Sequence, residues 1–202
     1  MKYLNQPFAL FLSKLYYKFY FVFYPRRPWI NKYAFNKLNS IINKNSVIAE
    51  YGAGKSTLFF AENSLRVYSI ESSMVWFESI KVQLESFTNV ILFHADREKL
   101  SLKSYASSLD NVCSEQLDIL FIDAYERNLC IESQWSKVKL GGYLIIDDYH
   151  RYFTFKSKYG DYLSKETTRP DYRVCERILS SYFNLKIYES GGFSTAFCKR
   201  IK

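Results

Sequence analysis

The stretch VIAEYGAGKST, Val47 to Thr57, decides the fold of this 202-residue chain. It starts as a short apolar strand, passes through an acid at Glu50, and turns at Gly52 and Gly54 toward a helix. Glycines two positions apart let the backbone turn sharply and approach a ligand closely. The free N–H groups that begin the next helix can receive an anionic group. The pattern therefore predicts a loop that binds a nucleotide-like cofactor.

Two kinds of loop fit these residues. Ala49 to Ser56 matches the loose Walker A spelling, in which Lys55 would contact phosphates and Ser56 would hold magnesium. Glu50 would then lie inside the loop, where a carboxylate ~4 Å from a phosphate costs on the order of 1 kcal/mol in water and more when desolvated. The acid suits a cationic ligand better, so a P-loop nucleotide-binding protein is the alternative hypothesis.

Four later segments are predicted as buried strands that finish on a carboxylate. They are Arg66 to Glu71, Asn89 to Asp96, Leu117 to Asp123 and Gly141 to Asp148. Ligands of open α/β sheets gather outside the carboxyl ends of the strands. We therefore expect one edge of the sheet to carry the acids Glu50, Glu71, Asp96, Asp123, Asp147 and Asp148.

The two ends of the domain also have regular patterns. Trp29 to Ile42 is predicted as a helix because its apolar residues have helical spacing. Ser181 to Glu189 and Phe193 to Ile201 are predicted as a β-hairpin joined at Ser190-Gly191-Gly192.

Glu50-Tyr51-Gly52-Ala53-Gly54 resembles the first motif of the class I S-adenosylmethionine-dependent methyltransferases, and the later acids follow in that family's order. The resemblance covers roughly residues 30 to 202. It implies an α/β fold with a Rossmann-like, doubly wound, seven-stranded sheet, mostly parallel with an antiparallel last strand. Residues 1–29 would precede this domain as an aromatic and basic helical segment. Glu50 to Ala61 and Val67 to Glu71 resemble a poorly characterised subset of these enzymes.

The resemblance implies S-adenosyl-L-methionine as the cofactor. Glu71 would accept from its ribose hydroxyls, and Asp96 would receive its adenine amino group. The structural alternatives are that Glu71 caps the following helix and that Asp96 lies in a solvated turn. The full set of implied cofactor-binding residues is Glu50, Tyr51, Gly52, Gly54, Ser56, Glu71, Ser72, Asp96 and Asp123.

Methyl transfer is an in-line displacement, so the protein mainly aligns the acceptor and supplies a group that takes its proton. The candidate catalytic residues are Asp123, Asp147, Asp148 and His150. The three aspartates resemble the Mg²⁺ ligands of metal-dependent catechol-type O-methyltransferases, and oxygen ligands suit that ion. Asp148 stands where that family has Asn, which weighs against a metal site.

The acceptor is predicted to contact the segment from Tyr149 to Arg173, which forms a polar and aromatic wall. Its cations Arg151, Lys156, Lys158, Arg169 and Arg173 would favour an anionic acceptor. The expected reaction is methylation of an oxygen or nitrogen of a small-molecule or glycan-like acceptor. Ile122-Asp123-Ala124-Tyr125 lacks the Asn/Asp-Pro-Pro-aromatic motif of base-amine methyltransferases, so nucleic acid is not the expected acceptor. A ribose methyltransferase stays an alternative, although the matching strand ends show no convincing Lys-Asp-Lys-Glu constellation. A domain that binds the cofactor without catalysis is a third possibility.

Composition indicates a folded cytoplasmic enzyme, with 48% hydrophobic and 24% charged residues. The four cysteines include no C-x-x-C pair, so neither a disulfide framework nor a zinc site is expected. The net charge of +8 fits nucleic acid, anionic lipid or acidic partners, and is most often a solvated basic surface.

The N-terminal segment is rich in Phe, Leu and Tyr from Phe8 to Tyr24, with Lys14 and Lys18 one helical turn apart. It is too short and too charged for a membrane span, and it lacks the cleavage site of a signal peptide. Two hypotheses remain: the helix packs over the domain, or residues 8–27 make peripheral contact with a membrane.

Overall fold

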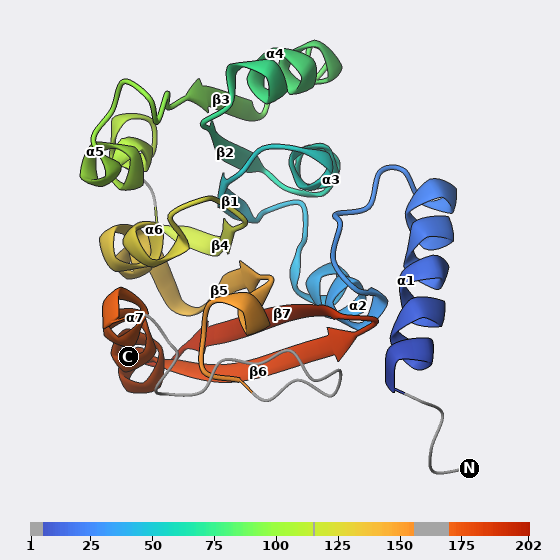
Figure 1. The fold of residues 1–202 in the computed structure, drawn as a ribbon. Helices are drawn as coiled ribbons and strands as arrows, with labels where there is room; N and C mark the ends of the chain where they lie inside the picture. Colours follow the sequence, from blue (N-terminus) through green and yellow to red (C-terminus); the bar gives the residue numbers. More distant parts are fainter. Residues whose placement is uncertain (1–5, 115, 156–169) are drawn as a thin grey trace.

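The computed structural model describes residues 6–114, 116–155 and 170–202 (Figure 1). Seven strands form one sheet in the order β3-β2-β1-β4-β5-β7-β6. The first five pair in parallel, whereas β7 is antiparallel to both β5 and β6. The predicted fold, including the antiparallel last strand inserted beside β5, is confirmed. The strands are β1 Val47–Tyr51, β2 Arg66–Glu71, β3 Val90–His94, β4 Leu117–Ile122, β5 Val138–Asp147, β6 Phe183–Ser190 and β7 Phe193–Arg200.

Helices connect the parallel strands and cover both faces of the sheet. Asn31 begins α2, because its side chain accepts from the N–H groups of Tyr33 and Ala34, so this helix starts later than the predicted Trp29. The α-helices are α1 Gln6–Phe23, α2 Lys32–Ile41, α3 Lys55–Asn63, α4 Met74–Gln83, α5 Leu102–Ala106, α6 Arg127–Gln134 and α7 Pro170–Tyr182. Short 3₁₀ turns are η1 Ser108–Asn111, η2 Trp135–Lys137 and η3 Tyr149–Arg151.

Two hydrophobic cores lie on opposite faces of the sheet because side chains alternate along each strand. Ile48 and Phe121 point to the face covered by α2 and α3. Ala49 and Leu120 point to the face covered by α5, α6 and α7 (Figure 1). All five residues of β1 are buried, as expected for a central parallel strand. This burial holds the loop after β1 in a fixed position.

Helix α1 packs at the margin of the molecule, beside α2 and the end of the β6–β7 hairpin (Figure 1). The buried ring of Tyr17 meets Phe193 edge-on, with 5.1 Å between ring centroids. Its hydroxyl accepts from the N–H of Lys32 at 3.3 Å. One face of α1 therefore belongs to the folded domain. Within the described ranges, every helix is too short or too polar to cross a bilayer.

Candidate active site

A cleft of about 1240 Å³ opens at the carboxyl ends of the parallel strands. Its volume exceeds the roughly 300–1,000 Å³ typical of small-molecule sites, so it has room for a cofactor together with an acceptor. The predicted site residues that line it come from the ends of the five parallel strands, β1 to β5. They are Gly52, Glu71, Ser72, Asp96, Asp123 and Asp148.

Gly52 turns the chain after β1 with φ +96°, a conformation that favours glycine. A Cβ on this residue would lie 2.2 Å from the backbone oxygen of Asp123. Two backbone hydrogen bonds fix the turn, from Gly52 N–H to Ile70 and from Asp123 N–H to Tyr51. Gly54 differs, because its φ of 175° is ordinary extended backbone and no atom lies within 4 Å of a Cβ built there.

Glu50 lies behind the cleft wall, although it was predicted to face the ligand. It is still inside β1, so strand alternation sends its side chain under α3 rather than out of the sheet edge. Its carboxylate accepts from Ser56 Oγ at 2.7 Å and from Ser69 Oγ at 2.9 Å. Complete burial raises its pKa to about 7, although the hydroxyl donors oppose that rise.

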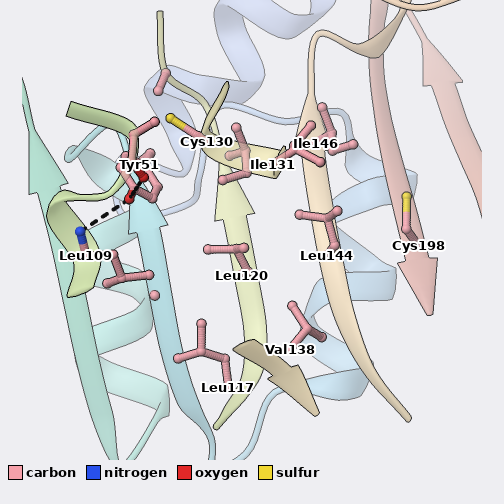
Figure 2. Close-up of a cluster of buried hydrophobic side chains, with 14 of the residues drawn as sticks. Tyr51, Leu109, Leu117, Leu120, Cys130, Ile131, Val138, Leu144, Ile146 and Cys198 are labelled. Atoms are coloured by element: carbon pink, nitrogen blue, oxygen red, sulfur yellow. Dashed lines mark hydrogen bonds between the residues drawn. The ribbon is translucent and has the colours of Figure 1, made fainter. Parts of the chain in front are cut away.

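Tyr51 points the opposite way, into the core under α5 and α6 (Figure 2). Its hydroxyl donates to the carbonyl of Ala106 at 2.6 Å and accepts from the N–H of Leu109 at 3.3 Å. Tyr51 is therefore a core residue that anchors the end of β1. It lies outside the described lining of the cleft.

The geometry of Lys55 and Ser56 argues against a phosphate-binding loop. The hydroxyl of Ser56 turns inward and donates to Glu50, so it is not directed toward a magnesium ion. The ammonium of Lys55 lies 5.2 Å from the centre of the Trp29 ring. Gly54 donates its N–H to Thr57 Oγ1 at the start of α3. Neither Gly54 nor Ser56 is among the described residues that line the cleft.

Glu71 ends β2 with its carboxylate held between two backbone donors. One oxygen accepts from the N–H of Ala53 at 2.9 Å, and the other accepts from the N–H of Ser73 at 2.6 Å. Ser73, rather than Glu71, is the N-cap of α4, so the helix-cap alternative for Glu71 is wrong. The carboxylate ties the glycine loop to the end of β2 and retains further acceptor capacity toward the cleft.

Asp96 follows β3 and forms a turn at the cleft. One oxygen accepts from the N–H of Glu98 at 2.9 Å, and the other pairs with Lys99 at 3.3 Å. The Glu98 hydrogen bond is the main reason that the pKa of Asp96 is lowered. Both features match the solvated-turn alternative, while the position in the cleft lining also suits a ligand contact.

Asp123 and Asp148 both line the cleft, and each forms an ion pair with an arginine. Arg127 Nη2 lies 2.5 Å from Asp123 Oδ1, and Arg151 Nη1 lies 3.1 Å from Asp148 Oδ2. The Asp123 side chain is 43% exposed on its cleft side, and protein surrounds it elsewhere. This desolvation raises its pKa to about 6; Asp148 adds to the rise and Arg127 opposes it.

Asp147 and His150 lie away from the described cleft lining, contrary to their predicted catalytic placement. Asp147 is buried at the end of β5 and accepts from Thr195 Oγ1 at 2.8 Å. Its pKa is raised, chiefly by burial and also by Asp123. Ser194 Oγ lies 2.6 Å from Nδ1 of His150 and 2.9 Å from its backbone N–H. Asp147 therefore links β5 to β7, and His150 links η3 to β7.

The magnesium hypothesis finds no support in the side-chain geometry. Among the described residues, no three His, Cys, Asp or Glu side chains are placed so that they could share a metal ion. Asp147 is buried and accepts from Thr195, whereas Asp123 and Asp148 line the cleft.

Aromatic side chains complete the cleft. Tyr152 and Tyr172 belong to the segment predicted as an aromatic wall, whereas Trp76 and Tyr125 were not predicted as site residues. Tyr152 stacks on Tyr172 with 5.6 Å between centroids, and the Arg127 guanidinium lies 4.6 Å from the Tyr152 ring centre. Trp76 and Tyr125 line the cleft and are largely exposed. Their positions shortly after the strand-end acids Glu71 and Asp123 were the sequence signal that could have identified Trp76 and Tyr125. Tyr149, predicted for this wall, is buried against Phe153 instead.

Of the five cations predicted to favour an anionic acceptor, the structure describes Arg151 and Arg173. Arg151 lines the cleft but pairs with Asp148, and Arg173 is not part of the lining. Lys156, Lys158 and Arg169 lie outside the described residues.

Comparison with known proteins gives a structural match only. No family model matches the chain, and no curated protein is similar enough to match it. Among solved structures, a candidate caffeoyl-CoA O-methyltransferase from Staphylococcus aureus has a TM-score of 0.61 at 16% identity, covering 98% of this chain and 100% of its own. An rRNA methylase from Streptococcus thermophilus has a TM-score of 0.56 at 14% identity, covering 83% and 93%.

A third match is the fibrillarin of Aeropyrum pernix in complex with natively bound S-adenosyl-L-methionine. Its TM-score is 0.57 at 12% identity, and the alignment covers 78% of this chain and 68% of that one. The chain therefore has the Rossmann-like fold of the class I S-adenosylmethionine-dependent methyltransferases. Proteins with this fold include one named as an rRNA methylase and one named as a caffeoyl-CoA O-methyltransferase, so the fold leaves the acceptor open.

Proposed function

We propose that this protein transfers the methyl group of S-adenosyl-L-methionine to an oxygen or nitrogen of a small-molecule or glycan-like acceptor. The observation that carries the proposal is the arrangement around Gly52. The turn lies against Asp123 and is tied to β2 through Glu71, so the glycine loop and two strand-end acids converge on one large cleft. Such an edge is where open α/β sheets bind their ligands.

The cofactor residues follow from this arrangement. Glu71 would accept from the ribose hydroxyls, Ser72 and Asp96 would contact the adenine side, and Gly52 would allow close backbone approach. The exposed side chains of Met74 and Trp76 on α4 give the adenine an apolar surface. When bound, the cofactor supplies an electrophilic methyl group on a positively charged sulfur.

The charge of the cleft supports this ligand over a nucleoside triphosphate. Its described lining carries six carboxylates and three guanidinium groups, and two of those guanidinium groups are paired with aspartates. A net negative cleft attracts a sulfonium and an ammonium and repels a polyphosphate. The excess of carboxylates over guanidinium groups also argues against a nucleic-acid backbone as the acceptor. The described lining of the cleft has no surplus positive charge that would bind an anionic acceptor.

The acceptor side is assigned to Asp123, Asp148 and the tyrosines. With a pKa of about 6, Asp123 is largely ionised at neutral pH and can take the proton that the acceptor releases. Arg127 orients that carboxylate through its ion pair. Tyr152, which is partly exposed in the cleft and held by stacking on the buried Tyr172, would contact a sugar or aromatic ring of the acceptor. Asp147 and His150 are assigned a structural role.

Calorimetric titration with S-adenosylmethionine, S-adenosylhomocysteine and Mg-ATP tests the cofactor. Both adenosyl ligands should bind the wild type and the Lys55→Ala variant, and Glu71→Gln should lose at least ten-fold in affinity. Glu78→Gln is the matched control, because this carboxylate is exposed on α4 and lies outside the described cleft lining. Binding of Mg-ATP alone, abolished in Lys55→Ala, would overturn the proposal in favour of the P-loop alternative.

The acceptor class is tested with methyl-tritiated cofactor. We expect label to enter a low-molecular-mass or glycan fraction of a cell extract, and Asp123→Asn to lower that rate by about 10²-fold or more, as for loss of a general base. Label that enters only the RNA fraction would contradict the acceptor part of the proposal and leave the cofactor part standing.

A further inference from the structure

The outer face of α1 is a continuous apolar surface. Residues three or four apart on a helix share a face, and those opposite Tyr17 are all exposed. Phe11, Phe19, Val22 and Phe23 are 60%, 55%, 69% and 75% exposed. We define the α1 outer face as Phe11, Leu12, Leu15, Phe19, Val22 and Phe23.

This surface is not required to hold α1 on the domain. The opposite side of the helix does that, through Tyr17 and Tyr20, which are 1% and 7% exposed. Phe21 adds edge-on contact with Phe193, at 5.9 Å between centroids. An apolar helix face is normally covered by the rest of the protein, whereas the described chain covers only the Tyr17 side of α1.

The basic charge of the protein is concentrated in the same part of the chain. Residues 1–49 contain eight basic residues (Lys or Arg) and no acidic residue (Asp or Glu), whereas residues 50–202 contain 20 basic and 20 acidic residues. The entire net charge of +8 therefore belongs to the N-terminal quarter. On α1, Lys14 and Lys18 are exposed one turn apart beside the outer face, and no acid occurs in the helix.

The α1 helix also lies near the functional edge of the sheet. Its Tyr17 contacts Phe193 at the start of β7, and Thr195 of β7 is the register partner of Asp147 at the carboxyl end of β5. Because β7 runs antiparallel to β5, the β6–β7 turn is at the edge where the parallel strands end. A surface bound by α1 is therefore held beside that edge.

We propose that the α1 outer face docks on the surface of an anionic phospholipid bilayer, with α1 in the plane of the headgroups. Aliphatic and aromatic side chains bordered by lysines suit that interface, where apolar groups enter the acyl boundary and cations meet lipid phosphates. A second copy of this chain would bring two acid-free basic helices together. Nucleic acid would leave Leu12, Leu15 and Val22 without an apolar partner.

Vesicle sedimentation of the full chain tests the proposal. The wild type should sediment with phosphatidylcholine–phosphatidylglycerol vesicles, and far less with phosphatidylcholine alone or at high salt. Leu15→Ser with Phe19→Ser should lower the partition coefficient by about ten-fold or more, because two inserted apolar side chains are lost. Lys14→Gln with Lys18→Gln should lower it by about five-fold per charge, on anionic vesicles only.

The matched control replaces exposed apolar residues elsewhere, Val82→Ser with Leu140→Ser, which are 64% and 68% exposed. These changes should leave sedimentation unchanged, and all variants should unfold at the wild-type denaturant midpoint. Folded wild-type protein that stays in the supernatant with anionic vesicles overturns the proposal. Unchanged vesicle binding of the Leu15→Ser, Phe19→Ser variant also overturns it. The same holds if the wild type binds no vesicles but forms a dimer in solution and the double substitution dissociates that dimer.

Discussion

Gly52 and Gly54 occupy the same sequence motif but face different physical constraints. Gly52 has φ +96° and no room for a Cβ beside Asp123, whereas Gly54 is extended with open space around it. We expect Gly52→Ala to destabilise the protein by roughly 3 kcal/mol, combining left-handed strain with overpacking. Gly54→Ala should cost less than about 1 kcal/mol as a helix N-cap change. Urea unfolding of the two variants measures the contrast, and equal losses would contradict it.

Glu50 should make stability depend on pH. Its pKa is about 7 in the folded protein against an ordinary 4.5, so the folded state binds more protons between those values. Stability from this group is therefore full below about pH 4.5 and is lost as pH rises to about 7. The Glu50→Gln variant removes this titration.

The measurement is the unfolding free energy of wild type and Glu50→Gln at several pH values. The difference should shift by about 3 kcal/mol in favour of the variant from acidic to mildly alkaline pH. Ser56 and Ser69 hydroxyls can rotate to accept from the amide, so the variant should fold. Parallel pH profiles would show that Glu50 ionises normally.

Asp123 should make cofactor affinity depend on pH. Its pKa of about 6 means that its negative charge develops between about pH 5 and about pH 7. S-adenosylmethionine affinity should rise several-fold across that interval because the sulfonium is cationic. S-adenosylhomocysteine, which lacks that charge, should change less, and Asp123→Asn should abolish the difference. Identical profiles for both ligands in the wild type would exclude this role.

Helix α1 has one face that packs on the domain and one that is exposed, and stability measurements can distinguish their contributions. Tyr17→Ala removes a buried ring that contacts Phe193 and should cost about 3 kcal/mol or more. Phe19→Ala removes an exposed ring on the outer face and should change stability by less than about 0.5 kcal/mol. Denaturant midpoints of both variants give the test, and a large loss in Phe19→Ala would mean that the outer face is covered by protein.

At the same scale, elements with strong local signals were predicted well. The apolar run before Glu71 forms β2, and the run before Asp123 forms β4. The predicted glycine turn connects β6 to β7. The start of α2 was misplaced by three residues because Asn31 caps the helix, which depends on its side chain meeting two N–H groups. Periodicity identified the elements, and local hydrogen bonds set their ends.

At the scale of the whole molecule, cofactor binding should stabilise the entire fold. The cleft is built from the ends of five strands of one sheet and the loops that follow them, so unfolding any of them destroys it. A ligand at a hundred-fold excess over Kd adds about 2.7 kcal/mol. For a chain of this size that raises the melting temperature by roughly 5–10 °C. Calorimetric scans with S-adenosylmethionine should show this rise, and Mg-ATP at the same concentration should give none.

The sequence by itself determined the strands, the final hairpin and the acids at the strand ends, because these features depend on local hydrophobic runs, glycine turns and chain order. The antiparallel placement of the last strand was implied by the resemblance to the methyltransferase family. Tertiary structure decided which acids face the ligand. Glu50 and Asp147 were turned inward by strand alternation and by partners on α3 and β7. It also decided that α1 packs through Tyr17 and leaves its outer face open, because only the assembled hairpin provides the surface that Tyr17 contacts.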